Sequence, residues 1–235
     1  MSVVRPVNLK FMRWFYVAAL TAALTTGDLE KLRDRQDGAA LERAAAELRA
    51  AADKQQSDAP AQYQAALASS YAAEVAVELR DKAKGKEMAE QGIAAAKRAV
   101  ALKPNNAEYN RLLGTLCGQM ISANGLAALH YGHCALDSVN KAIELDPKSS
   151  EAYVAHGVGN YYLPALFGGG VEPAIKDFQK AIELNPKSAE AYLWLGIALR
   201  KANRPAEAHK ALARSLELDP NRVWTKQQLD KTPAR

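Results

Sequence analysis

The sequence lacks the residue patterns that enzymes and cofactor-binding proteins use for chemistry. The segment FGGGVEP is not followed by Lys-Ser or Lys-Thr, so it is not a nucleotide-binding phosphate loop. No CxxCH segment for haem attachment is present, and no serine stands in a nucleophile elbow. These absences predict a non-enzymatic protein without a cofactor.

Aromatic residues are also scarce, at 7% of the 235 residues, and no basic stripe with interleaved aromatics is present. The net charge of +5 is concentrated at the N-terminus, where Arg5, Lys10 and Arg13 precede residue 28 and no acid accompanies them. The remainder carries 28 bases against 26 acids. This distribution lacks the footprint of a nucleic-acid-binding protein, so we expect no nucleic-acid partner.

The N-terminus has no hydrophobic run long enough to span a bilayer, which requires about 18 to 20 apolar residues. Its uncharged stretch, WFYVAALTAALTTG at residues 14–27, instead has the length of a signal-peptide core. We predict that residues 1–27 are a signal peptide or a membrane-targeting segment, with cleavage before Asp28 as one option. The predicted location is the periplasm or cell envelope. The alternative is an uncleaved, packed helix in a cytoplasmic protein.

Residues that favour helices are abundant, and four segments share one pattern that ends in proline. The segments are AVALKP, AIELDP, AIELNP and SLELDP, and their prolines are 43, 39 and 34 residues apart. The last spacing equals the period of the tetratricopeptide repeat, or TPR. Proline ends a helix because it lacks an N–H and restricts the residue before it.

The last repeat resembles the TPR pattern closely, because it carries Tyr192, Leu195, Gly196, Leu199, Ala208, Leu212, Ser215 and Pro220 at the matching positions. This resemblance implies an all-α, right-handed solenoid of antiparallel helix pairs, A and B. We expect about three to four repeats with extra helices at both ends. The expected divisions are a helical region at 28–59, repeats at 60–104 (degenerate), 105–147, 148–186 and 187–220, and a capping helix and tail at 221–235.

The extra residues of the longer repeats fall between helix A and helix B. In the third repeat they lie within NYYLPALFGGGVEP (160–173), in the second within residues 118–132, and in the first near residues 77–92. Insertions in solenoids gather on one face, which often binds partners. A TPR chain with this layout and an LPALFGG loop is similar to the T component of bacterial tripartite ATP-independent periplasmic transporters. That resemblance implies a hydrophobic ligand or a substrate-binding protein as partner.

Helix A lines the concave surface of TPR proteins, which predicts a groove for a ligand or partner. The Lys, Asn and Arg set that grips a C-terminal carboxylate in co-chaperones is missing. The groove instead has an apolar middle with polar edges, as in many peptide or small-ligand sites. The predicted groove residues are Arg111, Thr115, Val154, Val158, Tyr161, Tyr162, Phe167, Leu193, Trp194, Ile197 and Arg200.

This groove supports two hypotheses: an adaptor that binds a protein or peptide, and a carrier that holds an apolar small molecule. Membrane association through the N-terminus and oligomerisation are both left open. In the alternative interpretation, Val154, Val158, Leu193 and Ile197 only pack against a neighbouring helix. Similarly, Leu166 and Phe167 either plug the edge of the core or line the site.

The two cysteines, Cys117 and Cys134, are placed on facing helices of the second repeat. In an exported protein they are candidates for a disulfide; in the alternative they are two small buried thiols. The segment HYGHC also sets His130, His133 and Cys134 on one helix face, where all three are able to bind zinc. We predict no metal site and keep this trio only as a weak candidate.

Overall fold

The computed structural model describes residues 24–123 and 125–234, and the side chains at positions 123, 125 and 167 lie outside this description. Within these residues every regular element is helical, which confirms the predicted all-α class. The helices are α1 (Thr26–Asp34), α2 (Gly38–Lys54), α3 (Ala59–Glu78), α4 (Lys82–Leu102), α5 (Ala107–Ala123), α6 (Ala128–Leu145), α7 (Ser150–Tyr162), α8 (Val171–Leu184), α9 (Ala189–Lys201), α10 (Pro205–Leu218) and α11 (Val223–Asp230), with 3-10 turns η1 (Gly125–Ala127) and η2 (Ala165–Phe167). None of these helices is both long and apolar enough to cross a membrane.

Most of the predicted N-terminal segment, residues 1–23, lies outside the described residues. Its last residues belong to α1, because Thr25 caps that helix. The Thr25 hydroxyl accepts a hydrogen bond from the Asp28 N–H, and the Asp28 carboxylate accepts one from the Thr25 N–H, both at 3.2 Å. Cleavage after Gly27 would remove this capping box, and losing such a cap costs about 1 kcal/mol of helix stability.

Short polar side chains start the helices. Asp58, Asp81, Ser149 and Ser188 each accept a hydrogen bond from the backbone N–H three residues further on. The two serines are the last residues of the DPKS and NPKS turns, so the same cap opens two successive A helices.

The prolines end the B helices as the sequence predicts. Asp146, Asn185 and Asp219, each directly before a proline, have φ between −138° and −133° and ψ between 88° and 91°. Proline excludes the helical conformation for the residue before it, so α6, α8 and α10 all end at this position.

Glycines let the paired helices cross closely. A Cβ added at Gly157 of α7 would lie 2.5 Å from the Phe178 ring of α8, and one at Gly196 of α9 would lie 2.5 Å from Leu212 of α10. Gly114 has the same relation to Val139. The side chains that cover these glycines are buried, so the crossing is the packing centre of each pair.

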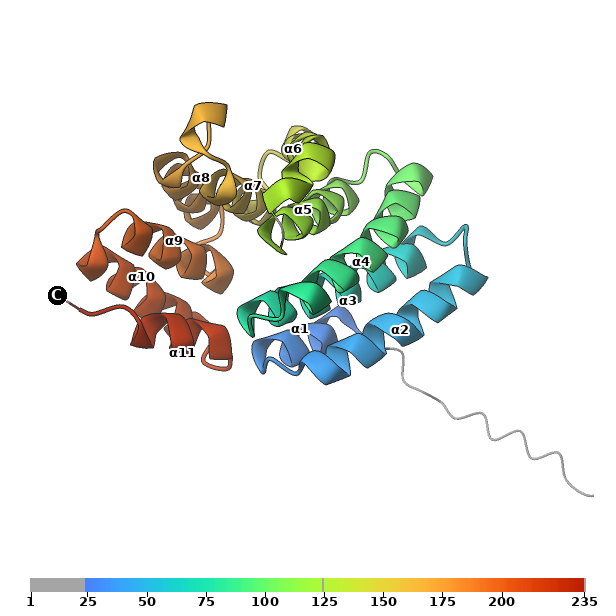
Figure 1. The fold of residues 1–235 in the computed structure, drawn as a ribbon, viewed down its shortest axis with the longest axis horizontal. Helices are drawn as coiled ribbons and strands as arrows, with labels where there is room; N and C mark the ends of the chain where they lie inside the picture. Colours follow the sequence, from blue (N-terminus) through green and yellow to red (C-terminus); the bar gives the residue numbers. More distant parts are fainter. Residues whose placement is uncertain (1–23, 124, 235) are drawn as a thin grey trace, which may run out of the picture.

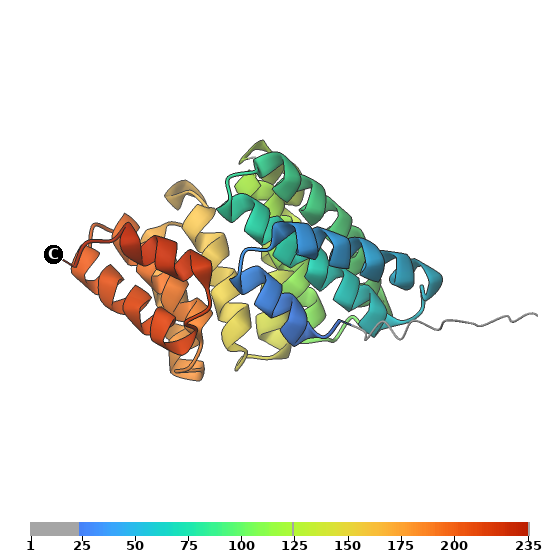
Figure 2. The ribbon, with the colours of Figure 1, turned by 90° about the horizontal axis from the view of Figure 1, so that it is seen from below.

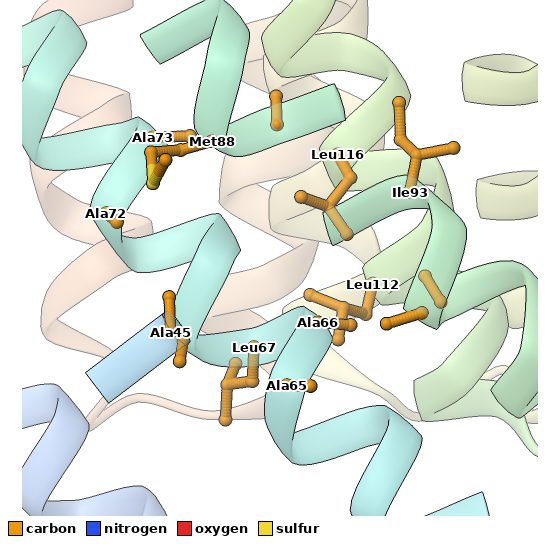
Figure 3. Close-up of a cluster of buried hydrophobic side chains, with 14 of the residues drawn as sticks. Ala45, Ala65, Ala66, Leu67, Ala72, Ala73, Met88, Ile93, Leu112 and Leu116 are labelled. Carbon is orange, nitrogen blue, oxygen red and sulfur yellow. The ribbon is translucent and has the colours of Figure 1, made fainter. Parts of the chain in front are cut away.

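Buried apolar residues form a large cluster in the N-terminal half and a second cluster in the C-terminal half. The first joins α1 to α5 and is rich in alanine, with Met88, Leu112 and Leu116 filling the spaces between alanines (Figure 3). The second joins α7 to α10 around Phe178. Alanine in the first cluster lets long helices approach with little side-chain volume between them.

The helix pairs follow one another along an arc, and α11 lies beside α1 where the arc ends (Figure 1). Figure 2 shows the same succession from below, with α9–α11 at one end of the molecule and α2 towards the other. Curvature of this kind results from the small rotation between neighbouring repeats.

The insertion of the third repeat lies between helices A and B, as predicted. Residues 163–170, which include η2, join α7 to α8, and Gly168 and Gly170 there have φ of 85° and 115°. The prediction of loop insertions in the first and second repeats was wrong. In the first, only residues 79–81 separate α3 from α4, and the extra residues lengthen these helices to 20 and 21 residues. In the second, most of the extra residues lengthen α5 and α6 to 17 and 18 residues, against 13 and 14 for α9 and α10.

Replacing Gly157 by alanine is expected to lower the free energy of unfolding by about 1–3 kcal/mol, because the new methyl group overlaps Phe178. Gly159 is the matched control, since it lies in the same helix and a Cβ there has no atom within 4 Å. Gly159→Ala should instead stabilise α7 by up to about 1 kcal/mol. Urea denaturation of both variants measures the difference, and equal effects would contradict the packing role of Gly157.

Candidate functional site

Three of the predicted groove residues belong to the core. Val154, Leu193 and Ile197 are 8%, 0% and 6% exposed, and they pack within the C-terminal clusters. Val158 is partly buried against the same core. The alternative interpretation, packing against neighbouring helices, therefore describes these side chains.

An aromatic group occupies the side of α7 and α9 where the groove was predicted. The Trp194 ring lies 6.0 Å from Tyr161, 6.4 Å from Tyr162 and 5.4 Å from Trp224 of α11, measured between centroids. The Trp194 indole N–H donates to Glu190 at 2.8 Å. Tyr162 remains 46% exposed, so the group has an accessible edge.

The Tyr162 phenol is a neutral donor and acceptor at physiological pH, because the ordinary pKa of tyrosine is about 10 and partial burial raises the pKa of Tyr162 further. Lys201 extends the group, because its Nζ lies 4.1 Å from the Tyr161 ring centroid and donates to the Tyr161 carbonyl at 3.2 Å. A cation over an aromatic ring is favourable, and it orders the exposed end of α7.

Arg111, another of the predicted groove residues, is held in an ion pair. Its guanidinium grips Glu108 through two hydrogen bonds of 2.6 Å and reaches Thr115 at 3.4 Å. Burial raises the pKa of the Glu108 carboxyl, but Arg111 more than reverses this and lowers it. The Tyr63 hydroxyl of α3 also donates to Glu108, at 2.8 Å, so this charge pair joins successive A helices.

Arg200 has a structural role in the C-terminal segment. It donates to the Gln228 carbonyl at 3.1 Å, to the Gln228 side chain at 2.6 Å and to the Thr232 hydroxyl at 2.8 Å. These bonds hold α11 and the following residues on α9. For Phe167 only the backbone is described, in η2, whereas the neighbouring Leu166 is 88% exposed and does not plug the core.

Arg222, which no sequence pattern indicated, stands directly before α11 and is only 2% exposed. Its Nη2 lies 2.6 Å from Glu74, and both nitrogens of the fork donate to Glu78. Nη1 also donates to the Arg33 carbonyl at 3.2 Å, and Nε lies 3.9 Å from Asp34. These partners come from α1 and α3, so Arg222 joins the two ends of the solenoid.

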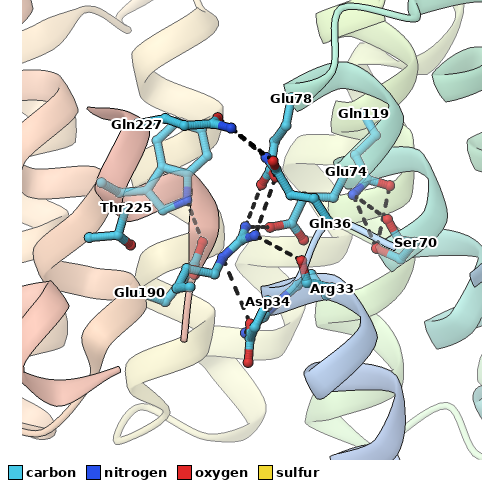
Figure 4. A network of polar contacts seen from close by, with 12 residues as sticks. Arg33, Asp34, Gln36, Ser70, Glu74, Glu78, Gln119, Glu190, Thr225 and Gln227 are labelled. Atoms are coloured by element: carbon cyan, nitrogen blue, oxygen red, sulfur yellow. Dashed lines mark hydrogen bonds and ion pairs between the residues drawn. The ribbon is translucent and has the colours of Figure 1, made fainter. Parts of the chain in front are cut away.

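Figure 4 shows Asp34, Glu74 and Glu78 converging on one region from α1 and α3. Beside them, Gln227 of α11 donates to Gln36 at 2.9 Å, and Gln36 donates to Glu78 at 2.7 Å. We call this set, with Arg222, the clasp. No local sequence pattern indicates the clasp, because Arg222 is 144 residues from Glu78.

The clasp carries more negative than positive charge. Burial raises the pKa values of Glu74 and Glu78, and Arg222 opposes the rise. Burial lowers the pKa of Arg33, but Glu74 and then Glu190 of α9 more than reverse this and raise it. Groups from α1, α3 and α9 thus act on one another across a common interior.

We use the name inner face for the A-helix side chains that make these polar and aromatic contacts: Tyr63, Tyr71, Glu108, Arg111, Tyr161, Tyr162, Glu190 and Trp194. A hollow of about 190 Å³ lies elsewhere, between α2, α3 and α4, and none of its lining residues belongs to the predicted groove.

The structure joins Cys117 of α5 to Cys134 of α6 in a disulfide, with 5.9 Å between their Cα atoms. The sulfur of Cys134 is therefore bonded to Cys117 and does not serve as a zinc ligand with His130 and His133. Among the described residues no group of three or more His, Cys, Asp or Glu side chains is arranged to hold a metal.

Antiparallel helix pairs with small residues at their crossings and proline-ended B helices define a TPR solenoid. The protein of known structure TTC0263, a TPR protein from Thermus thermophilus, has this fold with a TM-score of 0.60 at 16% identity, covering 86% of this chain and 97% of that one. The HusA haemophore from Porphyromonas gingivalis has a TM-score of 0.55 at 18% identity, covering 76% and 96%. At such identities the likeness concerns the fold.

Residues 28–231 match the family described as regulator of microtubule dynamics protein 1-3, and the chain belongs to this family. A search of curated proteins finds no match. The similarity to the transporter T component stays a prediction.

Replacing Arg222 by glutamine is expected to lower the free energy of unfolding by about 3–5 kcal/mol, because Glu78 is then buried without a counter-charge. Arg214→Gln is the control, since Arg214 pairs with Glu217 on the surface and such pairs contribute about 0–1 kcal/mol. Chemical denaturation compares the two. Similar small losses would mean that the clasp contributes no more than a surface ion pair.

Glu74→Gln is expected to change the pH dependence of stability. Because burial raises the folded-state pKa of Glu74 to about 8, the folded protein binds this proton more tightly than the unfolded chain does. That stabilisation is present below the unfolded pKa of about 4.3 and is lost as the pH rises towards 8. The wild type should therefore lose stability relative to Glu74→Gln between pH 5 and 8.

Thermal unfolding of both proteins across this range measures the effect, and Glu217→Gln on the exposed surface serves as the control. A difference that does not change with pH, or that changes in the opposite direction, would contradict the raised pKa.

Proposed function

We propose that this protein is a non-enzymatic interaction scaffold whose inner face binds a segment of a partner protein. The supporting observation is the convergence of side chains from successive A helices: Tyr63 with Glu108, Tyr161 with Trp194, and Arg33 with Glu74 and Glu190. Aromatic residues and arginines dominate the energetics of protein interfaces, and the inner face provides both.

Tyr162→Ala is expected to weaken binding of a partner peptide by about tenfold or more, because aromatic anchors carry a large share of interface energy. Peptides would be selected from a defined synthetic library, and their affinities measured by fluorescence anisotropy. Lys210→Ala, on the exposed side of α10, is the matched control and should have no effect. If the control variant loses binding and Tyr162→Ala does not, the binding surface lies outside the inner face.

A second candidate function is an interaction with microtubules, which the description of the family favours. Its test is co-sedimentation of the full chain with polymerised tubulin, in which a chain that remains in the supernatant excludes this candidate. A third candidate function, which follows from the resemblance to the transporter T component, is that of a carrier that holds an apolar small molecule against the aromatic group. Native mass spectrometry of the purified protein tests for a retained ligand.

For location, we propose the periplasm or cell envelope, on the strength of the uncharged segment 14–27 that follows three bases. The alternative is the cytoplasm. Cell fractionation of the full chain separates the two, and it also shows whether a shortened mature form exists.

A further inference from the structure

The binding of Arg222 in the clasp has the geometry of a recognition site for a guanidinium group. Two carboxylates share Nη2, and Nη1 donates to Glu78 and to the Arg33 carbonyl. A planar fork of donors against carboxylates is the arrangement that distinguishes arginine from lysine. The Trp224 ring, 5.6 Å from Cζ, adds a cation–π contact.

The site is not fully satisfied by its present occupant. The Nε of Arg222 is buried and has no hydrogen-bond partner, although its side chain is only 2% exposed. Three carboxylates, Asp34, Glu74 and Glu78, surround this single guanidinium. Arg33 is the other cation here, and its guanidinium pairs with Asp34 at 2.7 Å. Arg222 thus leaves one of its own donors unbonded in this pose, and a guanidinium that also bonded through Nε would make one more hydrogen bond at the same carboxylates.

The occupant is delivered by a short terminal element that has its own attachment. Trp224 and Leu229 pack against the cluster of Leu193, Ile197 and Leu212, and Arg200 holds the end of α11. The hydrogen bonds that join this element to α1 and α3 are those of Arg222, and Gln227 adds one to Gln36 in the turn after α1. An external arginine that takes the place of Arg222 thus leaves the attachment of α11 to α9 intact.

We propose that the acidic site of the clasp binds an arginine-bearing basic segment of a partner protein, which displaces Arg222 and opens the solenoid between α11 and α3. This inference rests on the proposed function and specifies the chemistry of the partner. In the absence of a partner, Arg222 occupies the site because its attachment to the same chain gives it a high effective concentration there. The form in which Arg222 joins α11 to α3 is therefore the resting form.

The test uses the full chain and a fluorescent peptide that contains two adjacent arginines, with a peptide of the same sequence carrying citrulline as a neutral counterpart. Arg222→Ala removes the competitor, so the arginine peptide should bind this variant at least tenfold more tightly than wild type. Arg222→Ala combined with Glu78→Gln should lose the gain, and Arg214→Ala, on the outer surface, should behave as wild type. The citrulline peptide should bind none of them.

Equal affinity of the arginine peptide for wild type and Arg222→Ala would overturn the proposal, as would a gain that survives Glu78→Gln. If Arg222→Ala does not fold, Arg222→Lys keeps the charge but loses the fork, and it should show a smaller gain in affinity. On the wild type itself, saturating arginine peptide should speed hydrogen exchange in α11, and unchanged exchange despite binding contradicts displacement.

Two outcomes separate this inference from the proposed function. In the first outcome, library peptides without arginine bind wild type, bind Tyr162→Ala more weakly, and bind the clasp variants as they bind wild type. The inner face would then remain the binding surface, and the proposed arginine site would be refuted. Dimerisation of wild type that Arg222→Ala abolishes would make the Arg222 of a second copy the occupant, and would overturn the proposed partner.

Discussion

The close crossing of helices A and B at glycine is the constraint on which the architecture depends. At Gly157 and Gly196 a ring or a branched side chain of helix B occupies the space that a Cβ would need. Repeating this crossing fixes the geometry of each pair, and the rotation between pairs then accumulates along the chain. The curvature that results brings α11 to α1, so a contact local to each repeat determines where the first and last helices of the solenoid meet.

Contact between the two ends of the solenoid buries charged side chains. Most solenoids have no such contact, because each repeat usually contacts only its neighbours. Here Arg222 and Glu78 lose almost all their contact with water. Removing charges from water costs several kcal/mol per ion, and a buried ion pair often does no better than apolar residues would. The clasp therefore acts as a constraint on where the two ends of the solenoid meet, since Arg222 contacts Asp34, Glu74 and Glu78 together.

The sequence predicted the parts of the structure that local chemistry controls. Proline restricts the residue before it regardless of context, so the ends of α6, α8 and α10 were predictable, and glycine with alanine identified the crossings. In the first repeat the same reasoning failed, because residues that favour helix extended α3 and α4 rather than forming a loop. Groove residues were assigned by register alone, which does not distinguish a partly exposed Trp194 from a buried Leu193.

The clasp depends on long-range geometry, and for that reason no local pattern indicated it. The sequence pattern places Glu74 and Glu78 as ordinary charged residues on a helix face, and it places Arg222 in a turn. Their pairing is decided by the total rotation of the repeats between them, to which every crossing contributes a little. A change of curvature in any repeat would therefore move Arg222 relative to α3. The position of Arg222 against Glu74 and Glu78 therefore reflects the sum of the rotations of all the repeats that lie between them.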